Sequence, residues 1–495
     1  GDWETVREIG SRKDYYPGFH DLNLAVLKRI SPLGDHLTGN LFSAFLGLLT
    51  IAGAMALARR MGGGAAAFLT GIFLLTWPRF YGHVFINPKD IPFAFGYIWS
   101  LCFLFDWFRR KTVPAWTTVL LSGLAIGVTM ASRIGGLVLL CYLGLFLGLL
   151  LLRSFFNRSE TPLSESIQSF IKCYFPRFLL VVLISMVVLL LYWPSGQWRP
   201  LAQTGGTLET VTHYQWPMAV FYEGAFYQSA DLPRSYILKM FLLTTPLQLL
   251  LLGLGGIAWI LGRDSKEFLK AKNEKTNPLG RLLIAFAVLF PLAYVIARDS
   301  NLYNGIRHLL FVIPPFAAIA GWATVRAWQW LKDGSPVLRL VLPGGLTLAV
   351  LITAIQMIRL HPYQYIHYNP IAGGTRGAAS SYETDYWGTA LKELAEEFGD
   401  YLKTEQPSLP RGYAVVNMEQ VTYLFRSFLP DDLPVRVVVV RSRPDLDDYY
   451  AAGTVWNAPE FHPGIPVLEV QRLGISLAII KDRRHIQPQE RENSQ

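Results

Sequence analysis

The segment from Phe80 to Phe95 carries side chains that could do chemistry in an unexpected place. It reads FYGHVFINPKDIPFAF and joins two strongly apolar runs that are typical of membrane-embedded helices. A tight connection between such runs needs only a turn, which Asn87-Pro supplies. It does not need His83, Lys89 and Asp90, because ionisable groups at the edge of hydrocarbon are costly and tend to mark a site. We interpret the segment as a candidate site; the alternative is an ordinary polar loop with interfacial charges.

The composition is that of a polytopic membrane protein. The 495 residues are 52% hydrophobic and only 16% charged, and the mean hydropathy is +0.29. The net charge of +9 would suit nucleic-acid binding, but the placement of the cations favours a membrane topology, so no nucleic-acid partner is expected. The 3 cysteines have neither metal-type nor disulfide-type spacing. No nucleotide or dinucleotide motif is present, and we predict no cofactor and no metal.

Ten apolar segments from residue 38 onward are candidate membrane spans, since a span needs about 20 apolar residues. They cover roughly 38–58, 64–80, 91–108, 116–132, 134–153, 178–194, 236–262, 282–298, 307–330 and 338–360. Residues 1–37 precede them as an outer loop, in which 21–30 has the pattern of an amphipathic helix at a membrane interface or of one packed on protein. The fold class is therefore mainly α, with a membrane body at 38–360.

The distribution of Lys and Arg gives an orientation. If the segment before residue 38 lies outside, the inner loops carry roughly twice as many Lys and Arg as the outer ones, as the positive-inside rule requires. The segment at 83–90, the long loop at 195–235 and the segment at 298–308 then all face outward. Because these segments hold most of the polar clusters, the possible sites share one side of the membrane. This orientation also predicts a missing first span upstream of Gly1.

Two of the outer segments add candidate residues. Long ordered loops are often functional, and the loop at 195–235 carries Glu223, Asp231 and Arg234 among many aromatic residues, which also fit an interfacial belt. Arg307 and His308 stand where the ninth span begins. Arginine can bind a phosphate with two parallel hydrogen bonds, and a helix N-terminus adds backbone N–H groups. The alternative for Arg307 is a side chain that reaches lipid headgroups.

Residues 361–495 have a different composition and predict a small α/β domain outside the cytoplasm. The spacing of apolar residues predicts helices over 385–402 and 419–428. Short apolar runs predict strands at 415–416 and 435–440, and 467–470 with 475–480 predict a hairpin around Leu473-Gly474. We find no catalytic motif in this domain. Its tail from Arg483 is polar and expected to be disordered.

With these residues in view, the chain resembles the C-type glycosyltransferase superfamily, and within it family 39, the protein O-mannosyltransferase-like enzymes. The resemblance covers nearly the whole chain in order. It rests on HVFINPKDIPF from His83, SADLPRSY from Ser229, TTP from Thr244, GIRHLLFVIP from Gly305, and the stretch from Gly373 through Tyr386-Trp-Gly388.

The resemblance implies an inverting transfer of a sugar, a hexose such as mannose, from a polyprenyl-phosphate donor at the outer membrane face. The partners would be the lipid-linked sugar, membrane lipid, and an acceptor protein, lipid or glycan. The family's general base is usually an acidic dipeptide directly after the first span, and Asp2-Trp3-Glu4 is not that dipeptide. We therefore expect the base upstream of Gly1, or else a chain that cannot act alone.

The residues themselves are compatible with this chemistry, since a lipid phosphate is a good leaving group and the site must mainly activate a hydroxyl and stabilise phosphate charge. Asp90 is the catalytic candidate, as a base or as a group that orients acceptor or donor. The other candidates divide into phosphate-binding residues (Lys89, Arg307, His308, Arg234) and substrate-binding residues (His83, Asn87, Glu223, Asp231). A transporter or flippase of lipid-linked sugars, in the cell membrane like the enzyme, is the alternative, although transporters place polar residues near the membrane midplane.

Overall fold

The computed structural model describes residues 17–109, 112–156, 163–198, 205–207, 219–270, 278–331, 336–405, 409, 411–418, 422–433, 435–441, 447–453 and 462–486. The chain forms two compact units. The first comprises 1–215, 233–301 and 306–354, and the second comprises 216–232, 302–305 and 355–495. Part of the loop predicted at 195–235 thus belongs to the second unit; its residues 199–204 and 208–218 lie outside the described residues.

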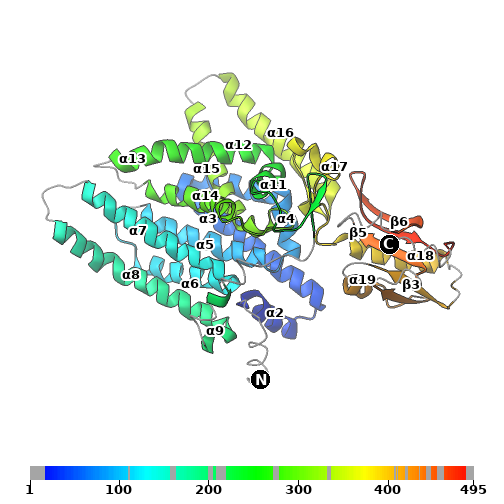
Figure 1. The fold of residues 1–495 in the computed structure, drawn as a ribbon. Helices are drawn as coiled ribbons and strands as arrows, with labels where there is room; N and C mark the ends of the chain where they lie inside the picture. The colour runs from blue at the N-terminus through cyan, green and yellow to red at the C-terminus, as the bar shows by residue number, and fades with distance from the viewer. Residues whose placement is uncertain are drawn as a thin grey trace. The chain divides into compact units, whose positions relative to one another are not determined.

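The first unit is helical (Figure 1). Its elements are α2 (Phe19–Ile30), α3 (Asp35–Leu75), α4 (Pro78–Ile86), α5 (Asp90–Phe108), α6 (Trp116–Ser132), η1 (Ile134–Leu137), α7 (Val138–Phe156), α8 (Leu163–Leu191), α9 (Pro194–Trp198), α11 (Tyr236–Thr244), α12 (Leu247–Trp259), η2 (Ile260–Asp264), α13 (Ser265–Lys270), α14 (Leu279–Ala297), η3 (Arg307–Val312), α15 (Ile313–Leu331) and α16 (Pro336–Leu360). Among the described residues, 8 helices are long and apolar enough to cross a membrane, and α6 is a shorter apolar helix. The predicted fold class, a mainly helical membrane protein, is confirmed.

The predicted spans 38–58 and 64–80 correspond to the two arms of α3, which reverses at Gly63. Gly63 has φ 85° inside this 41-residue helix, a conformation that interrupts the helical hydrogen bonding. A Cβ added at Gly71 would lie 3.0 Å from Sδ of Met55. In a straight helix these two positions would be about 24 Å apart. The two arms therefore pack against each other as a helical hairpin, with Arg59 and Arg60 near its tip.

The predicted span 236–262 is divided by Pro246. Thr245 is extended, with ψ 131°, because the ring of a following proline disfavours the helical conformation. The helix α11 therefore ends at Thr244, and α12 begins at Leu247. The apolar segment that could span a membrane runs from Leu247 to Phe268 and continues beyond the predicted end.

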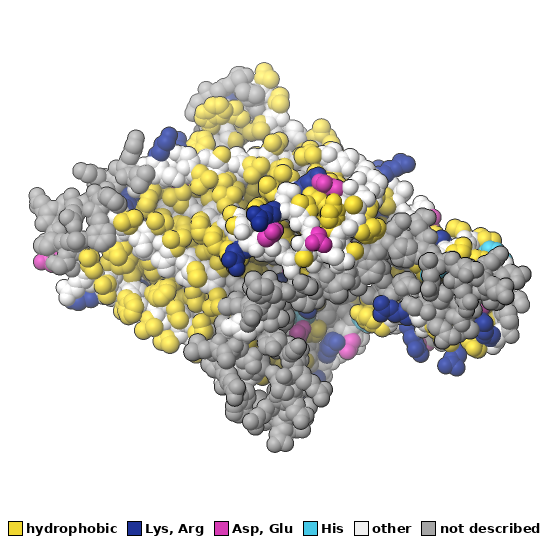
Figure 2. All heavy atoms as spheres, viewed as in Figure 1, with side chains coloured by type: hydrophobic (Ala, Val, Ile, Leu, Met, Phe, Trp, Pro, Cys, Tyr) yellow, Lys and Arg dark blue, Asp and Glu magenta, His cyan; other side chains and the backbone are white. Residues whose placement is uncertain are grey.

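The surface of the helical unit is apolar where the helices α7, α8 and α16 are exposed. Figure 2 shows hydrophobic side chains gathered over this unit, with only a few Lys and Arg side chains among them. Along α8, Phe175, Leu179, Leu183 and Val187 recur at helical spacing and are each about half exposed. Such a large contiguous apolar surface is unusual for a protein in water and is what a lipid-facing helix requires.

The second unit contains a five-stranded sheet of order β4-β3-β5-β7-β6. Its elements are β1 (Val220–Tyr222), β2 (Ala225–Tyr227), η4 (Gln364–Ile366), η5 (Pro370–Ala372), α17 (Gly374–Ala378), α18 (Ala390–Glu405), β3 (Tyr413–Asn417), α19 (Thr422–Phe428), β4 (Arg436–Val440), β5 (Tyr449–Gly453), β6 (Ile465–Arg472) and β7 (Ile475–Asp482). The strand β3 is parallel to β4 and β5, and β7 is antiparallel to β5 and β6. The predicted strands and the hairpin at Leu473-Gly474 are all present.

Three details of this unit differ from the sequence prediction. The helix α18 begins at Ala390 rather than at 385, because residues before it form turns. Strand β5 is additional: its sequence YYAAG has two tyrosines, which favour strands, but its alanines and glycine do not. Arg483, predicted as the start of a disordered tail, is fully buried and pairs with Asp447 at 2.8 Å; residues 487–495 lie outside the described residues.

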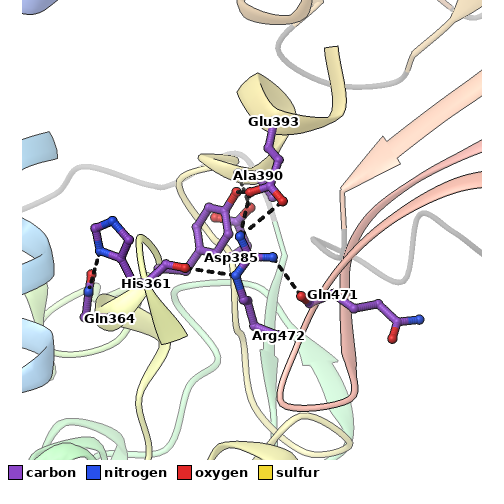
Figure 3. Close-up of polar contacts among 8 residues, drawn as sticks. His361, Gln364, Asp385, Ala390, Glu393, Gln471 and Arg472 are labelled. Carbon is purple, nitrogen blue, oxygen red and sulfur yellow. Dashed lines mark hydrogen bonds and ion pairs between the residues drawn. The ribbon is translucent and has the colours of Figure 1, made fainter. Parts of the chain in front are cut away.

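A polar junction around Arg472 connects the segment after α16 to the sheet (Figure 3). Nε of Arg472 donates to the backbone oxygen of His361 at 2.9 Å, and Nη2 donates to Oε2 of Glu393 at 2.8 Å. The hydroxyl of Tyr363 donates to the same carboxylate at 2.6 Å, and its ring stacks with the guanidinium group. The junction thereby joins the end of β6 to α18 and to the chain leaving the last apolar helix.

The predicted amphipathic helix is α2. Its exposed side chains include Leu22, Val26 and Ile30, whereas His20 is buried and its ring contacts the hydroxyl of Ser43 on α3. One face thus packs on protein and an apolar face remains exposed, which suits a helix at an interface. Its position at a membrane surface stays a prediction.

Candidate functional site

The turn between α4 and α5 is organised by the side chain of Asn87. Its Oδ1 accepts the backbone N–H of Asp90 at 2.9 Å and that of Lys89 at 3.2 Å, which fixes the turn that leads into α5. Because this oxygen is an acceptor, Nδ2 must be the donor group. It lies 2.7 Å from Oδ2 of Asp90 and 3.3 Å from Nδ1 of His83. One amide therefore connects a helix start, a carboxylate and an imidazole.

Asp90 forms an ion pair with Arg133, the residue that follows α6. The distance from Oδ1 of Asp90 to Nη2 of Arg133 is 2.5 Å, and the Asp90 side chain is almost fully buried. The two residues meet because α5 and α6 pack closely near their ends. At the crossing, a Cβ on Gly96 would lie 2.9 Å from the backbone nitrogen of Thr129, so only glycine allows this approach.

His83 is fully buried on α4. Its Nδ1 faces the amide donor of Asn87, so the neutral ring carries its proton on Nε2. The pKa of His83 is lowered to about 3, first by burial and then by Arg79 and Arg307, while Asp90 opposes the change. His83 is therefore a neutral hydrogen-bond donor at physiological pH.

A second segment of the site comes from the start of the ninth predicted span. Arg307 and His308 begin η3, which leads directly into α15. Phe311 on this turn packs against Phe93 and Tyr97 of α5 with ring centroids 4.9 and 4.7 Å apart. This aromatic contact places the η3 turn beside α5. His308 accordingly lies within electrostatic range of Arg133, as Arg307 does of His83.

Two predicted phosphate-binding residues lie elsewhere in the first unit. Lys89 is exposed, and its charge acts on Asp21 of α2. Arg234 forms an exposed ion pair with Asp299, with 3.2 Å between Nε and Oδ2. Such surface pairs contribute little to stability, about 0–1 kcal/mol, and can open readily.

Two predicted substrate-binding residues, Glu223 and Asp231, belong to the second unit. Glu223 has φ 53° and Gly224 has φ 78°, the geometry of a tight turn, between β1 and β2. Both carboxylates are exposed. The hairpin packs through Tyr222 on Tyr382.

The structure adds two cations that the sequence did not single out, Arg79 and Arg133. Arg79 on α4 is 0% exposed, although it is a charged residue. Each is a single cation at the end of an apolar run, where a side chain that reaches lipid headgroups is the ordinary explanation. Only the packing of α4, α5 and α6 reveals the burial of Arg79 and the ion pair of the half-buried Arg133 with Asp90.

The cluster formed by Arg79, His83, Asp90, Arg133 and Arg307 has more positive than negative charge. Three guanidinium groups and one carboxylate in a partly buried setting favour an anionic ligand. The neutral His83 adds a donor that carries no charge. Among the residues that the structure describes, no group of three or more His, Cys, Asp and Glu side chains could hold a metal ion.

Comparison with known protein families finds no match, and neither does comparison with curated proteins. Solved structures similar to this chain include ArnT from Cupriavidus metallidurans, with a TM-score of 0.49, 15% identity, and coverage of 96% of this chain and 91% of that one. AglB, the archaeal oligosaccharyltransferase from Archaeoglobus fulgidus, matches with a TM-score of 0.46 and 13% identity, over 93% of this chain and 66% of that one. The arabinofuranosyltransferase AftD from Mycobacteria matches with a TM-score of 0.40 and 12% identity, over 93% of this chain and 34% of that one.

Proposed function

We propose that this protein is a membrane glycosyltransferase that moves a sugar from a polyprenyl-phosphate donor to an acceptor outside the cytoplasm. The observation that carries the proposal is the partly buried, net positive cluster around His83 and Arg307, built from α4, α5, the residue after α6, and η3. It lies in a helical unit with a large apolar surface. A lipid-linked sugar phosphate has the two properties that such a site would bind, an apolar tail and an anionic head.

Each group has a part in the proposed reaction. Guanidinium groups would stabilise the negative charge that develops on the departing phosphate, which is the main electrostatic demand of the transfer. The neutral imidazole of His83 would help to orient the groups that hold the sugar or the phosphate ester. Asp90 would orient the acceptor or take its proton. The displacement inverts the anomeric centre, with a hexose such as mannose as the transferred sugar and a protein, lipid or glycan as the acceptor.

The proposal is tested with the full chain in lipid nanodiscs and undecaprenyl-phosphate carrying a radiolabelled hexose. Arg307→Ala and Asp90→Ala are expected to reduce label transfer by at least about 100-fold, since lost transition-state contacts of this kind cost two or more powers of ten. Arg326→Ala, an exposed arginine on the same helix α15, is the matched control and should keep full activity.

Two results would count against the enzyme. Wild-type rates in both site variants would remove the cluster from the reaction. Movement of the labelled lipid across sealed vesicles, with no label appearing on any acceptor and no free undecaprenyl phosphate released, would instead identify a transporter of lipid-linked sugars.

A further inference from the structure

The five-stranded sheet of the second unit has two end strands, and their outer edges differ. Within the described residues, the order β4-β3-β5-β7-β6 makes β4 and β6 the end strands. Strand β6 contains Pro466 and the exposed Glu469, and its pairing with β7 has two irregularities of register. Proline, charge and bulges are the features that keep an edge strand from pairing with another chain. The edge of β6 is therefore protected.

Strand β4 has none of these features between Val437 and Val440. Its sequence is RVVVV, and each of the four valines is partly exposed. Its parallel pairing with β3 is regular over all five residues. Valine is one of the residues that favour strands most. An unprotected edge of this kind is open to the addition of another strand.

The backbone of β4 directs hydrogen-bonding groups along this outer edge. The N–H of Met418 donates to the C=O of Val440 at 3.0 Å, so the backbone groups of Val440 point toward β3. Successive residues of a strand direct these groups to opposite sides. Those of Val437 and Val439 therefore point away from β3, as two N–H donors and two C=O acceptors on residues about 6.6 Å apart. A second extended backbone matches this pattern.

Two arginines at the ends of β4 distinguish between possible occupants. Arg436 and Arg441 are both exposed. If two copies of this chain paired through β4, the symmetric strands would run antiparallel, and each end would place Arg436 from one copy near Arg441 from the other. Like charges beside each other across strands are destabilising. A segment of another protein with acidic residues at its ends is instead complementary to both arginines.

We propose that the outer edge of β4 is a docking site for an extended segment of another polypeptide, which adds to the sheet as a further strand. The segment is uncharged and rich in β-branched residues over about four positions, the length of the open edge, and has acidic residues at its ends. The backbone groups of Val437 and Val439 bind it, and Arg436 and Arg441 select its charge. This inference goes beyond sugar transfer, because binding requires no donor.

The test measures binding of a fluorescein-labelled peptide, EEVTVTVEE, to the full chain in lipid nanodiscs by fluorescence anisotropy. The wild type should bind this peptide saturably. The peptide EEVTPTVEE should bind at least about tenfold more weakly, because proline removes a donor and interrupts the hydrogen-bonded ladder. The peptide KKVTVTVKK has the same centre with basic ends, and it should bind about fivefold more weakly, the effect expected of exposed charges.

Variants of the chain locate the binding at this edge. Val439→Pro removes one outward N–H and leaves the hydrogen bonds to β3, so the Kd for EEVTVTVEE should rise at least about tenfold. Val438→Pro removes an N–H that points toward β3 and should lower the melting temperature. Arg436→Glu combined with Arg441→Glu should reverse the preference, so that KKVTVTVKK binds more tightly than EEVTVTVEE. Lys392→Glu, at an exposed position on α18, is the control and should keep the wild-type preference.

The outcomes that overturn the proposal are distinct. No binding of EEVTVTVEE to the wild type, or equal binding to the wild type and Val439→Pro, would refute it. If Val439→Pro does not fold, the charge reversal decides, and an unchanged preference would refute the site. Association of the full chain with itself that Val439→Pro abolishes would identify a second copy as the occupant and would also overturn it. Saturable peptide binding by a protein that transfers no sugar would count against the proposed function alone.

Discussion

The amide of Asn87 illustrates how a single side chain can set the chemistry of a site. Its oxygen fixes the turn that leads into α5, and its nitrogen contacts both Asp90 and His83. The turn at Asn-Pro, and the candidate status of His83, Asn87 and Asp90, are predictable from the sequence because the types and the local spacing carry the information. The ion pair with Arg133 is not, since it joins residues brought together only by helix packing.

A second buried carboxylate at the residue scale, Asp385, predicts a dependence of stability on pH. It accepts hydrogen bonds from the backbone of Thr389 at 3.0 Å and of Ala390 at 2.9 Å, and from the hydroxyl of Tyr365. Burial raises the pKa of Asp385 to about 7, and the hydrogen bonds from Ala390 and Thr389 oppose the change. The folded state therefore binds this proton more tightly than the unfolded chain.

The sign of the effect follows from linkage. Because the folded pKa lies above the unfolded value of about 3.9, the contribution of Asp385 to stability is full below that value and is lost as pH rises toward 7. The melting temperature of the wild type in detergent should thus decrease as pH is raised from about 4.5 to about 7.5, a range that runs from just above the unfolded pKa to just above the folded one. Asp385→Asn should melt lower at pH 4.5 but show a smaller fall. Asp400→Asn, an exposed carboxylate on α18, should keep the wild-type slope.

At the scale of elements, the approach of α5 to α6 determines whether Asp90 can reach Arg133. Gly96→Ala would place a methyl group 2.5 Å from Oγ1 of Thr129 and 2.9 Å from its backbone nitrogen. The helices must separate, so we expect a lower melting temperature and at least about a tenfold loss of transfer, since small displacements of catalytic groups are costly. Gly148→Ala on α7 meets nothing within 4 Å and should be neutral or slightly stabilising. Equal behaviour of the two variants would contradict this account.

Hydropathy predicts most helices of the first unit because each must cover about 30 Å of hydrocarbon with apolar residues. It does not predict where they bend. The reversal at Gly63 occurs in a run of three glycines, and it brings Gly71 of one arm against Met55 of the other. Likewise β5 is a strand because it has a partner on each side, not because of its own composition.

At the scale of the whole molecule, the excess of Lys and Arg in the predicted inner loops leads to a prediction of sidedness. The site segment at 83–90 and the C-terminal domain should lie on the outer side, and the segment around Arg263 should lie inside. An acceptor outside the cytoplasm requires this arrangement, because the sugar must be released where the acceptor is. The three native cysteines, Cys102, Cys141 and Cys173, can be replaced to give a background without thiols.

Single cysteines in that background test the orientation. Cysteines in place of Lys89 and of Asp432 occupy exposed positions, and both should react with a membrane-impermeant maleimide in intact cells. A cysteine in place of Arg263, also exposed, should react only after the membrane is permeabilised. If positions 89 and 432 were labelled from opposite sides, the candidate site and the sheet domain could not serve one extracytoplasmic acceptor. If the labelling were reversed at all three positions, the orientation derived from the positive-inside rule would be wrong. A transfer reaction on the cytoplasmic side would then have to replace the one proposed.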